Sequence, residues 1–189
     1  VLEDVNFRVE EVLDFVHTSV RFPMEQKGLE YACNLADDVP LKLWGDSLRL
    51  KQVLLNLMSN AVKFTAKGIV GLRINREQDK EGDWLHFVIS DTGMGISSEY
   101  QQHLFDPYTQ ANSSISRRFG GTGLGLSICK HIAEIMRGSL WCESELGEGS
   151  HFHLRIPCIP ARNVYCEISQ EAQDIPPLKK TRDIKILLV

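Results

Sequence analysis

The chain has 189 residues, of which 43% are apolar and 24% charged, as is typical of a globular domain with a substantial core. Its net charge of −4 lacks the basic surplus that binding to nucleic acid or to an anionic membrane surface needs, so neither contact is expected. No apolar run reaches the ~18 residues of a membrane span, and the first residues lack the pattern of a secretion signal. The five cysteines are widely spaced without a C-x-x-C pair, which disfavours a zinc site or disulfide framework. We therefore expect a cytoplasmic location, and a membrane anchor elsewhere in a longer parent protein stays open.

The first part of the chain predicts two helices separated by a strand. Apolar residues at helical spacing predict a helix over Phe7–Met24, and alternation predicts a strand over Leu29–Leu35. Gly45–Asp46–Ser47 is typical of a helix start, with Asp46 or Ser47 as the N-cap. This second helix is expected to run to about Phe64 and to stop before Gly68.

The middle of the chain predicts a β-hairpin, a long irregular stretch, a helix and a second hairpin. The irregular stretch, residues 91–125, is rich in Gly, Ser and Thr, and such a length without regular structure is usually functional. The other elements are expected at Ile69–Asn75, Trp84–Ser90, Leu124–Arg137, Ser139–Glu143 and Ser150–Ile156. The first hairpin loop is placed at 77–83, and Gly138 is expected as the C′ residue of the helix.

The end of the chain has a different character. We expect one domain over residues 1–160, and then a polar linker over 161–182 that contains Pro176–Pro177. Residues 183–189 form a new apolar run, which indicates the truncated start of another domain.

The helix expected to end at Phe64 carries a polar stripe beside its apolar face. Asn56, Asn60 and Lys63 lie at positions i, i+4 and i+7, so their side chains can reach one spot. A carboxamide oxygen can ligate Mg²⁺ without adding negative charge beside phosphates, and a lysine can contact a phosphate oxygen. A solvent-facing helix side explains the stripe equally well.

A strand that ends in Asp91–Thr92–Gly93–Met94–Gly95–Ile96 is the second candidate site. A carboxylate at a strand end can accept a hydrogen bond from an exocyclic amine, and the glycines allow a flat group to approach the backbone. Taken alone, this stretch is explained more simply by an ordinary glycine turn with a capping aspartate.

A glycine-rich segment before the later helix is the third candidate site. Gly120, Gly121, Gly123 and Gly125 expose backbone N–H groups at a helix start, which favours an anion, and Arg117 and Arg118 precede them. The segment lacks the G-K-[ST] of a Walker loop, the spacing of a dinucleotide fingerprint, and the motif set of eukaryotic-type protein kinases. A flexible loop remains the alternative.

The three stretches, in this order, resemble the catalytic domain of histidine kinases and its wider ATPase superfamily, which includes type II topoisomerases, a heat-shock chaperone and mismatch-repair ATPases. Residues 50–65 resemble the N box of the family, Asp91–Gly95 its G1 box, Leu104–Tyr108 its F box and Gly121–Gly125 its G2 box. The resemblance covers about Phe7–Pro157.

The resemblance implies a two-layer α/β sandwich of the α+β class, with a mixed, largely antiparallel sheet, helices on one face and a long ATP lid over 105–120 that Phe105 and Tyr108 anchor by packing. It implies ATP and Mg²⁺ as ligands, with Asn56 and Asn60 serving the metal, and Asn56, Asn60 and Lys63 as the catalytic residues. Asp91 is expected to bind the adenine amine. The nucleotide-binding residues are expected to be Asn60, Lys63, Phe64, Asp91, Gly93, Gly95, Ile96, Arg117, Arg118, Gly121, Thr122, Gly123, Leu124 and Gly125.

One position distinguishes transfer from hydrolysis. Branches of the superfamily that hydrolyse ATP carry a glutamate, as a base for water, four residues before the metal-binding asparagine. That position is Asn56 here, and an amide takes no proton at neutral pH. The sequence therefore favours transfer to a protein side chain over a mechanical ATPase.

The acceptor of the phosphoryl group is not expected in this chain. The family places an acceptor histidine, followed by Glu or Asp, on a helical hairpin, and none of the six histidines has that neighbour. We expect the chain to start after this hairpin, to bind Mg-ATP and not to phosphorylate itself on histidine.

The expected function is that of a sensor histidine kinase domain. It would donate the γ-phosphoryl group of ATP to a histidine on the dimerisation domain of a homodimeric parent protein. Lys185–Val189 resembles the first strand of a receiver domain, which suggests a hybrid kinase, although a chance apolar end is an alternative. A catalytically silent nucleotide-binding regulatory module is the alternative function.

Overall fold

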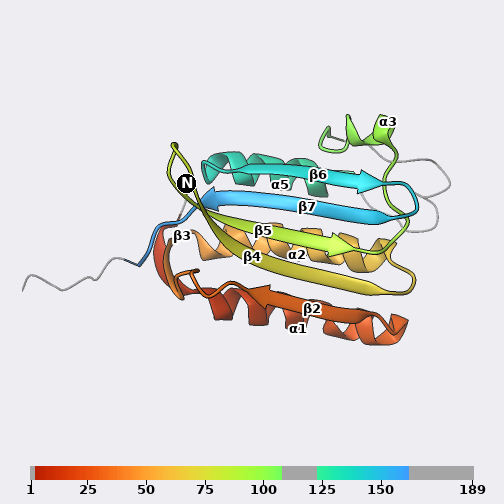
Figure 1. Cartoon of the computed structure of the whole chain (residues 1–189), viewed down its shortest axis with the longest axis horizontal. Coiled ribbons are helices and arrows are strands. Elements are labelled where there is room, and N and C mark those ends of the chain that lie inside the picture. The colour runs from red at the N-terminus through yellow and green to blue at the C-terminus, as the bar shows by residue number, and fades with distance from the viewer. Residues whose placement is uncertain (1–2, 108–122, 162–189) are drawn as a thin grey trace, which may run out of the picture.

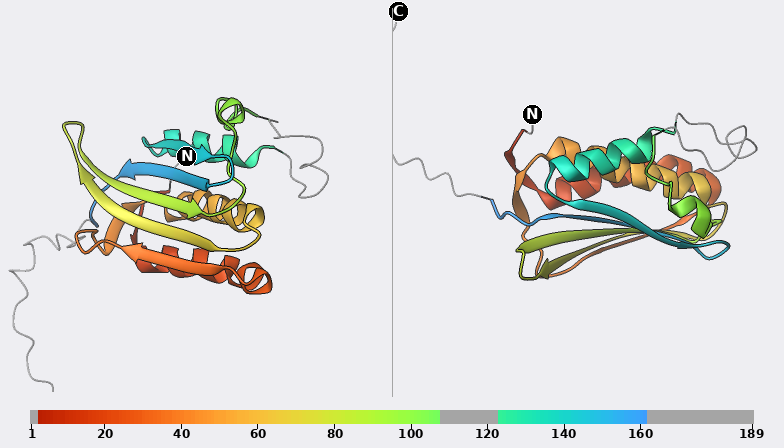
Figure 2. Two further views of the ribbon diagram at one scale, coloured as in Figure 1. Left: turned by 45° about the vertical axis from the view of Figure 1, so that its right-hand side comes forward. Right: turned by 90° about the horizontal axis from the view of Figure 1, so that it is seen from above.

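The computed structural model of the chain describes residues 3–107 and 123–161, which form two layers (Figure 1). One layer is a five-stranded sheet. The other consists of α1 (Val9–Lys27), α2 (Ser47–Phe64) and α5 (Gly125–Ile135), which all cover the same face of that sheet (Figure 2). A one-turn helix, α3 (Ser98–Gln101), lies at one end of the domain. None of the helices in these residues combines the length and the apolar character needed to cross a membrane.

The large sheet is mixed and mostly antiparallel, as the family resemblance implies. In spatial order its strands are β2 (Glu30–Leu35), β4 (Ile69–Gln78), β5 (Asp83–Asp91), β7 (Gly149–Pro157) and β6 (Ser139–Glu145). Only the β2–β4 pair is parallel. The carboxyl end of β5 therefore lies in the middle of the sheet, at the same end of the domain as the last turn of α2 (Figure 1).

A second, two-stranded sheet was not predicted and corrects the start of the first helix. β1 (Val5–Arg8) pairs antiparallel with β3 (Lys42–Gly45), and Phe7 lies opposite Leu43. The helix predicted from Phe7 therefore starts two residues later, at Val9, after Arg8 in an extended conformation. Pairing with a distant strand overrides the helical spacing of the apolar residues here.

The core lies between the sheet and the helices. α1 contributes a stripe of buried residues at spacings of three and four, and β5 contributes every second residue, as amphipathic elements must. These residues are Val9, Val12, Val16, Val20 and Met24 from α1 and Leu85, Phe87 and Ile89 from β5. Burying each such side chain contributes about 1.5–3 kcal/mol, so this packing holds the helix layer and the sheet together.

The end of α5 differs from the prediction that Gly138 is the C′ residue, because the C-cap is Met136 and Arg137 follows it. Arg137 takes the left-handed conformation with φ of 59°, and the Gly138 N–H donates to the carbonyl of Ala133. Gly138 is needed for another reason, because a Cβ atom there would lie 2.1 Å from the carbonyl oxygen of Arg155. The glycine thus allows the end of α5 to approach β7.

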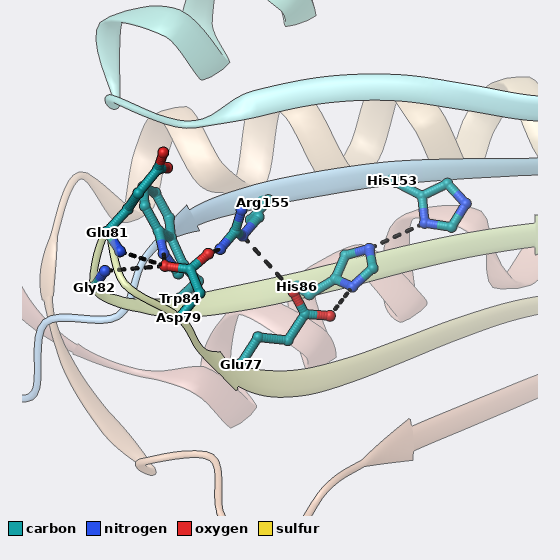
Figure 3. Close-up of polar contacts among 8 residues, drawn as sticks. All are labelled: Glu77, Asp79, Glu81, Gly82, Trp84, His86, His153 and Arg155. Carbon is teal, nitrogen blue, oxygen red and sulfur yellow. Dashed lines mark hydrogen bonds and ion pairs between the residues drawn. The ribbon is translucent and has the colours of Figure 1, made fainter.

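The β4–β5 hairpin is longer than predicted, and polar contacts on the open face of the sheet hold its loop. The strands pair to Gln78 and Asp83, which leaves only residues 79–82 as the loop. The Asp79 carboxylate accepts hydrogen bonds from the N–H groups of the loop, from Trp84 and from Arg155, which lower its pKa to about 2 (Figure 3). Hydrogen bonds also join Glu77, His86 and His153 across β4, β5 and β7 (Figure 3). This network stabilises the face that the helices leave uncovered.

Candidate functional site

The three candidate stretches meet at one end of the domain. A Cβ atom on Gly125, at the start of α5, would lie 2.7 Å from Asn56 Nδ2 on α2. A Cβ atom on Gly93, just after β5, would lie 2.7 Å from the carbonyl oxygen of Phe64 at the end of α2. The last turns of α2 therefore contact both of the other stretches, and the same end of the domain carries α3 (Figure 1).

The polar stripe of α2 is positioned by the helix itself. Asp46 accepts a hydrogen bond from the Arg49 N–H at 2.9 Å and is the N-cap, so of the two predicted candidates Asp46 and not Ser47 has this position. Asn60 Nδ2 donates to Asn56 Oδ1 at 3.2 Å, and both side chains are half-buried. Lys63 follows one turn on, with Nζ at 5.1 Å from the ring centroid of Phe64. The two carboxamides and the ammonium group thus occupy one side of the helix.

The acidic residue of the site is Asp91, which is buried with a relative exposure of only 7%. Burial raises the pKa of its carboxyl group, because the charged form loses water. The Gly93 N–H, which donates to Asp91 Oδ1 at 2.8 Å, counteracts part of this effect, and His151 and the hydroxyl groups of Ser150 and Thr65 contribute further in the same direction. The result is a partly dehydrated acceptor at the end of β5.

The loop after Asp91 is held against the β6–β7 turn. Gly95 has φ of 67°, and a Cβ atom there would lie 1.9 Å from the carbonyl oxygen of Glu145. The Ile96 N–H donates to Ser144 Oγ at 2.9 Å. Gln101 Nε2 on α3 donates to the carbonyl oxygens of both Ile96 and Ser144, at 2.8 and 2.7 Å. A side chain at position 95 would therefore clash with the β6–β7 turn, which explains why this residue is glycine.

The start of α5 is a helix terminus that is entered through glycine. Gly123 has φ of 72°, and Leu124 is the N-cap without a side chain that could bond to the first turn. The N–H groups of a first helical turn have no partner within the helix, and the helix dipole adds a partial positive charge there. Gly123, Leu124 and Gly125 are all half-buried, and a helix N-terminus is a type of site that favours anions.

Part of the predicted site lies outside the described residues. This applies to Arg117, Arg118, Gly121 and Thr122, to Tyr108, and to most of the predicted lid. Phe105 is described and packs against the core, with Lys130 Nζ at 5.5 Å from its ring centroid. The predicted linker and receiver start, residues 161–189, lie almost entirely outside the described part, so the domain division stays a prediction.

Two residues beside Asp91 were missed by sequence reasoning. Thr65 is fully buried, and Ser150 lies directly opposite Asp91 in the β5–β7 pair. Thr65 is the last residue of the stretch 50–65 that resembles the N box, but the sequence pattern predicted no function for it. Ser150 carries no local signal, because only strand pairing brings it to the acid.

The residues fit a magnesium nucleotide on two structural grounds. The missing side chains at Gly93 and Gly125 leave room beside Asp91 and Asn56 that a Cβ atom would fill. The donor set also fits, because carboxamide oxygens suit Mg²⁺, while an ammonium group and a helix N-terminus suit phosphate.

Comparison with known proteins agrees with this geometry. Residues 45–160 match the family model described as histidine kinase-, DNA gyrase B-, and HSP90-like ATPase. The chain is 39% identical over 161 residues to the sensor histidine kinase RcsC of Salmonella typhimurium, covering 85% of the chain and 17% of RcsC. It is 39% identical over 177 residues to the sensor protein GacS of Pseudomonas syringae, covering 93% of the chain and 19% of GacS. The chain thus spans less than a fifth of the length of these relatives.

A solved structure shares the fold. Full-length ShkA, crystallised in complex with AMPPNP, superposes with a TM-score of 0.73 at 30% identity, covering 85% of this chain and 32% of ShkA. The resemblance inferred from the motifs and the two-layer fold are both confirmed. Because the family model spans more than half of its residues, the chain belongs to the histidine kinase-, DNA gyrase B- and HSP90-like ATPases, and the relatives named here are sensor histidine kinases.

Proposed function

We propose that this domain binds Mg-ATP and donates its γ-phosphoryl group to a histidine on a helical dimerisation domain outside the chain. The observation that carries the proposal is the double contact of α2. A Cβ atom on Gly125 at the start of α5 would lie 2.7 Å from Asn56 Nδ2, and one on Gly93 beside the buried acid would lie 2.7 Å from the Phe64 carbonyl oxygen. One bound nucleotide can therefore reach all three stretches.

The base is proposed to bind at the end of β5. The half-dehydrated Asp91 carboxylate would accept the exocyclic amine of adenine, since its Oδ1 is already bonded to the Gly93 N–H and its orientation is thereby fixed. Phe64 and Ile96, both half-buried, would line this part of the site.

The triphosphate is proposed to lie between α2 and α5. Asn60 and Asn56 would hold Mg²⁺, which when bound neutralises phosphate charge. Lys63 would contact a phosphate oxygen, and the backbone N–H groups of Gly123–Gly125 would donate to others. Arg117, Arg118, Gly121 and Thr122 are proposed as further phosphate contacts on sequence grounds alone.

Transfer is favoured over hydrolysis by the chemistry of residue 56. Asn56 is half-buried and hydrogen-bonded to Asn60, and an amide cannot accept a proton from water. Phosphoryl transfer relies mostly on positioning and charge stabilisation, which these side chains can supply without a base. We therefore expect the isolated chain to turn over ATP very slowly.

The remaining parts of the kinase are proposed to lie elsewhere in a longer, homodimeric protein. The named relatives are about five to six times longer than the aligned segment, as their covered shares of 17% and 19% imply. A helical dimerisation and acceptor domain and a downstream receiver domain are the proposed partners, with the domain itself in the cytoplasm.

The proposal is tested in two steps with the purified chain. Mg-ATP is titrated calorimetrically, and the chain is then mixed with Mg-ATP and the acceptor hairpin of its parent protein. We expect saturable binding that weakens when Mg²⁺ is chelated, and acid-labile phosphate on the hairpin but not on the chain alone. Binding without phosphate on the hairpin would instead identify a silent regulatory module, and rapid ATP turnover by the chain alone would identify a hydrolase.

A further inference from the structure

The last residue of α1, Lys27, holds the end of α2. Its ammonium group donates to the carbonyl oxygens of Val62, Lys63 and Thr65 at 2.6, 2.9 and 3.1 Å. An ammonium group has three N–H donors, so all of its hydrogen-bonding capacity is directed at this one helix terminus. The last carbonyls of a helix lack partners within the helix, and Lys27 supplies them from another element.

The backbone of Lys27 is itself fixed. Gly28 ends α1 in the left-handed conformation with φ of 64°, and its N–H donates to the Glu25 carbonyl at 3.1 Å. The Leu29 N–H donates to the Met24 carbonyl at 3.1 Å, and both of these side chains are buried in the core. Lys27 is exposed, but its backbone lies in a well-anchored turn and its ammonium group is held by three carbonyl oxygens.

The carbonyls that Lys27 binds belong to the segment that carries the proposed site. Lys63 is the proposed phosphate contact, and the carbonyl of Phe64, between two of the bonded residues, faces Gly93. Thr65, whose carbonyl is the third acceptor, has its hydroxyl near the Asp91 carboxylate. A shift of this segment would thus disturb the phosphate end and the adenine end together.

We propose that Lys27 is a positioning residue of the nucleotide site, which acts by holding the backbone of residues 62–65 in place against Gly93. The inference rests on the proposed function, because it concerns the affinity of that same site. Lys27 need not touch the nucleotide, since it acts through the main chain of α2. Its positive charge also complements the negative end of the α2 dipole.

The test compares Lys27→Met, which keeps the length of the side chain and removes the ammonium group, with Lys67→Met. Lys67 is exposed two residues beyond the bonded segment, so this control removes the same charge nearby without removing the three hydrogen bonds. Mg-ATP is titrated into each variant, and amide spectra are recorded without nucleotide by ¹⁵N NMR.

We expect Lys27→Met to raise the Kd for Mg-ATP by roughly tenfold, since displacement of site groups by a fraction of an ångström is costly. The amide resonances of Lys63, Phe64, Thr65 and Gly93 should shift in this variant, and Lys67→Met should stay within about twofold of the wild type. Equal affinities of the two variants, or unmoved amides in Lys27→Met, would overturn the role of Lys27.

If Lys27→Met does not fold, Lys27→Arg takes its place under the same criteria, because a planar guanidinium cannot direct three donors to these three carbonyls in the same way. Failure of the wild type to bind Mg-ATP would overturn the proposed function and this inference with it. Wild-type binding with an unaffected Lys27 variant would overturn this inference alone.

Discussion

Replacing Asp91 by asparagine should separate nucleotide affinity from stability. The Gly93 N–H donates to Asp91 Oδ1, so the amide oxygen of asparagine should keep this bond. The NH₂ group then takes the place of Oδ2 and would face the amine of adenine. Both groups are hydrogen-bond donors, so no hydrogen bond can form between them. A hydrogen bond to a charged group contributes about 1.5–3 kcal/mol, which corresponds to a loss of affinity of roughly 10- to 150-fold.

The same substitution should not destabilise the free domain at neutral pH. Burial raises the pKa of Asp91 above the ordinary value of 3.8, so the folded state binds this proton more tightly than the unfolded state does. The ionised carboxylate therefore lowers the free energy of unfolding at pH 7, and asparagine removes that cost. The stability difference between variant and wild type should shrink as the pH falls through the raised pKa of Asp91 toward the ordinary value of 3.8, below which the carboxyl group is protonated in both the folded and the unfolded state.

A matched control lies at the other end of β5. Asp83 is paired with Arg76 at 2.5 Å, and this hydrogen bond lowers the pKa of its carboxyl group, so Asp83→Asn should lose stability while keeping nucleotide affinity. The assays are calorimetric titration with Mg-ATP and thermal unfolding at pH 7 and pH 4. Unchanged affinity in Asp91→Asn, or the same pattern of losses in both variants, would refute the assignment of Asp91 to adenine.

Three other substitutions or conditions probe the packing around the site. Gly125→Ala places a methyl group 2.7 Å from Asn56 Nδ2, so the affinity for Mg-ATP measured by calorimetry should fall several-fold. This loss is expected although alanine has a higher helix propensity than glycine. Unchanged affinity would contradict the prediction. Gly138→Ala meets the Arg155 carbonyl and should lower stability in denaturant titrations by about 1–3 kcal/mol, whereas a neutral effect would mean that α5 and β7 separate easily. Burial lowers the pKa of His153, so stability should fall as the pH drops through about 6.5, and melting curves of His153→Gln should show a smaller acid loss.

The helices and strands near the site were predictable where several local signals agree. α2 combines an N-cap at Asp46, an apolar face and a stop after Phe64, and the structure gives these same ends. β1 was not predictable, because the apolar spacing around Phe7 suits a helix and only pairing with Leu43 decides for a strand. The C′ position of α5 was assigned to Gly138 by its type, while close packing required the glycine there and left Arg137 in the left-handed conformation.

The site was predictable as three motifs, and its supporting residues were not. Asn56, Asp91 and Gly125 each belong to a pattern with a physical meaning, and the structure brings the three together. Lys27 and Ser150 belong to no pattern, because a lysine at a helix end and a serine in a strand are common. Their positions beside the site arise only from tertiary packing, which the sequence does not display.

We propose that one bound nucleotide contacts α2, the end of β5 and the start of α5 together. A single ¹⁵N NMR titration of the chain with Mg-ATP tests this claim most directly, with amides of Asn60, Gly93 and Gly125 as reporters. We expect all three resonances to shift along one saturation curve with one Kd. Shifts confined to one of the three segments, or three curves with different midpoints, would contradict it.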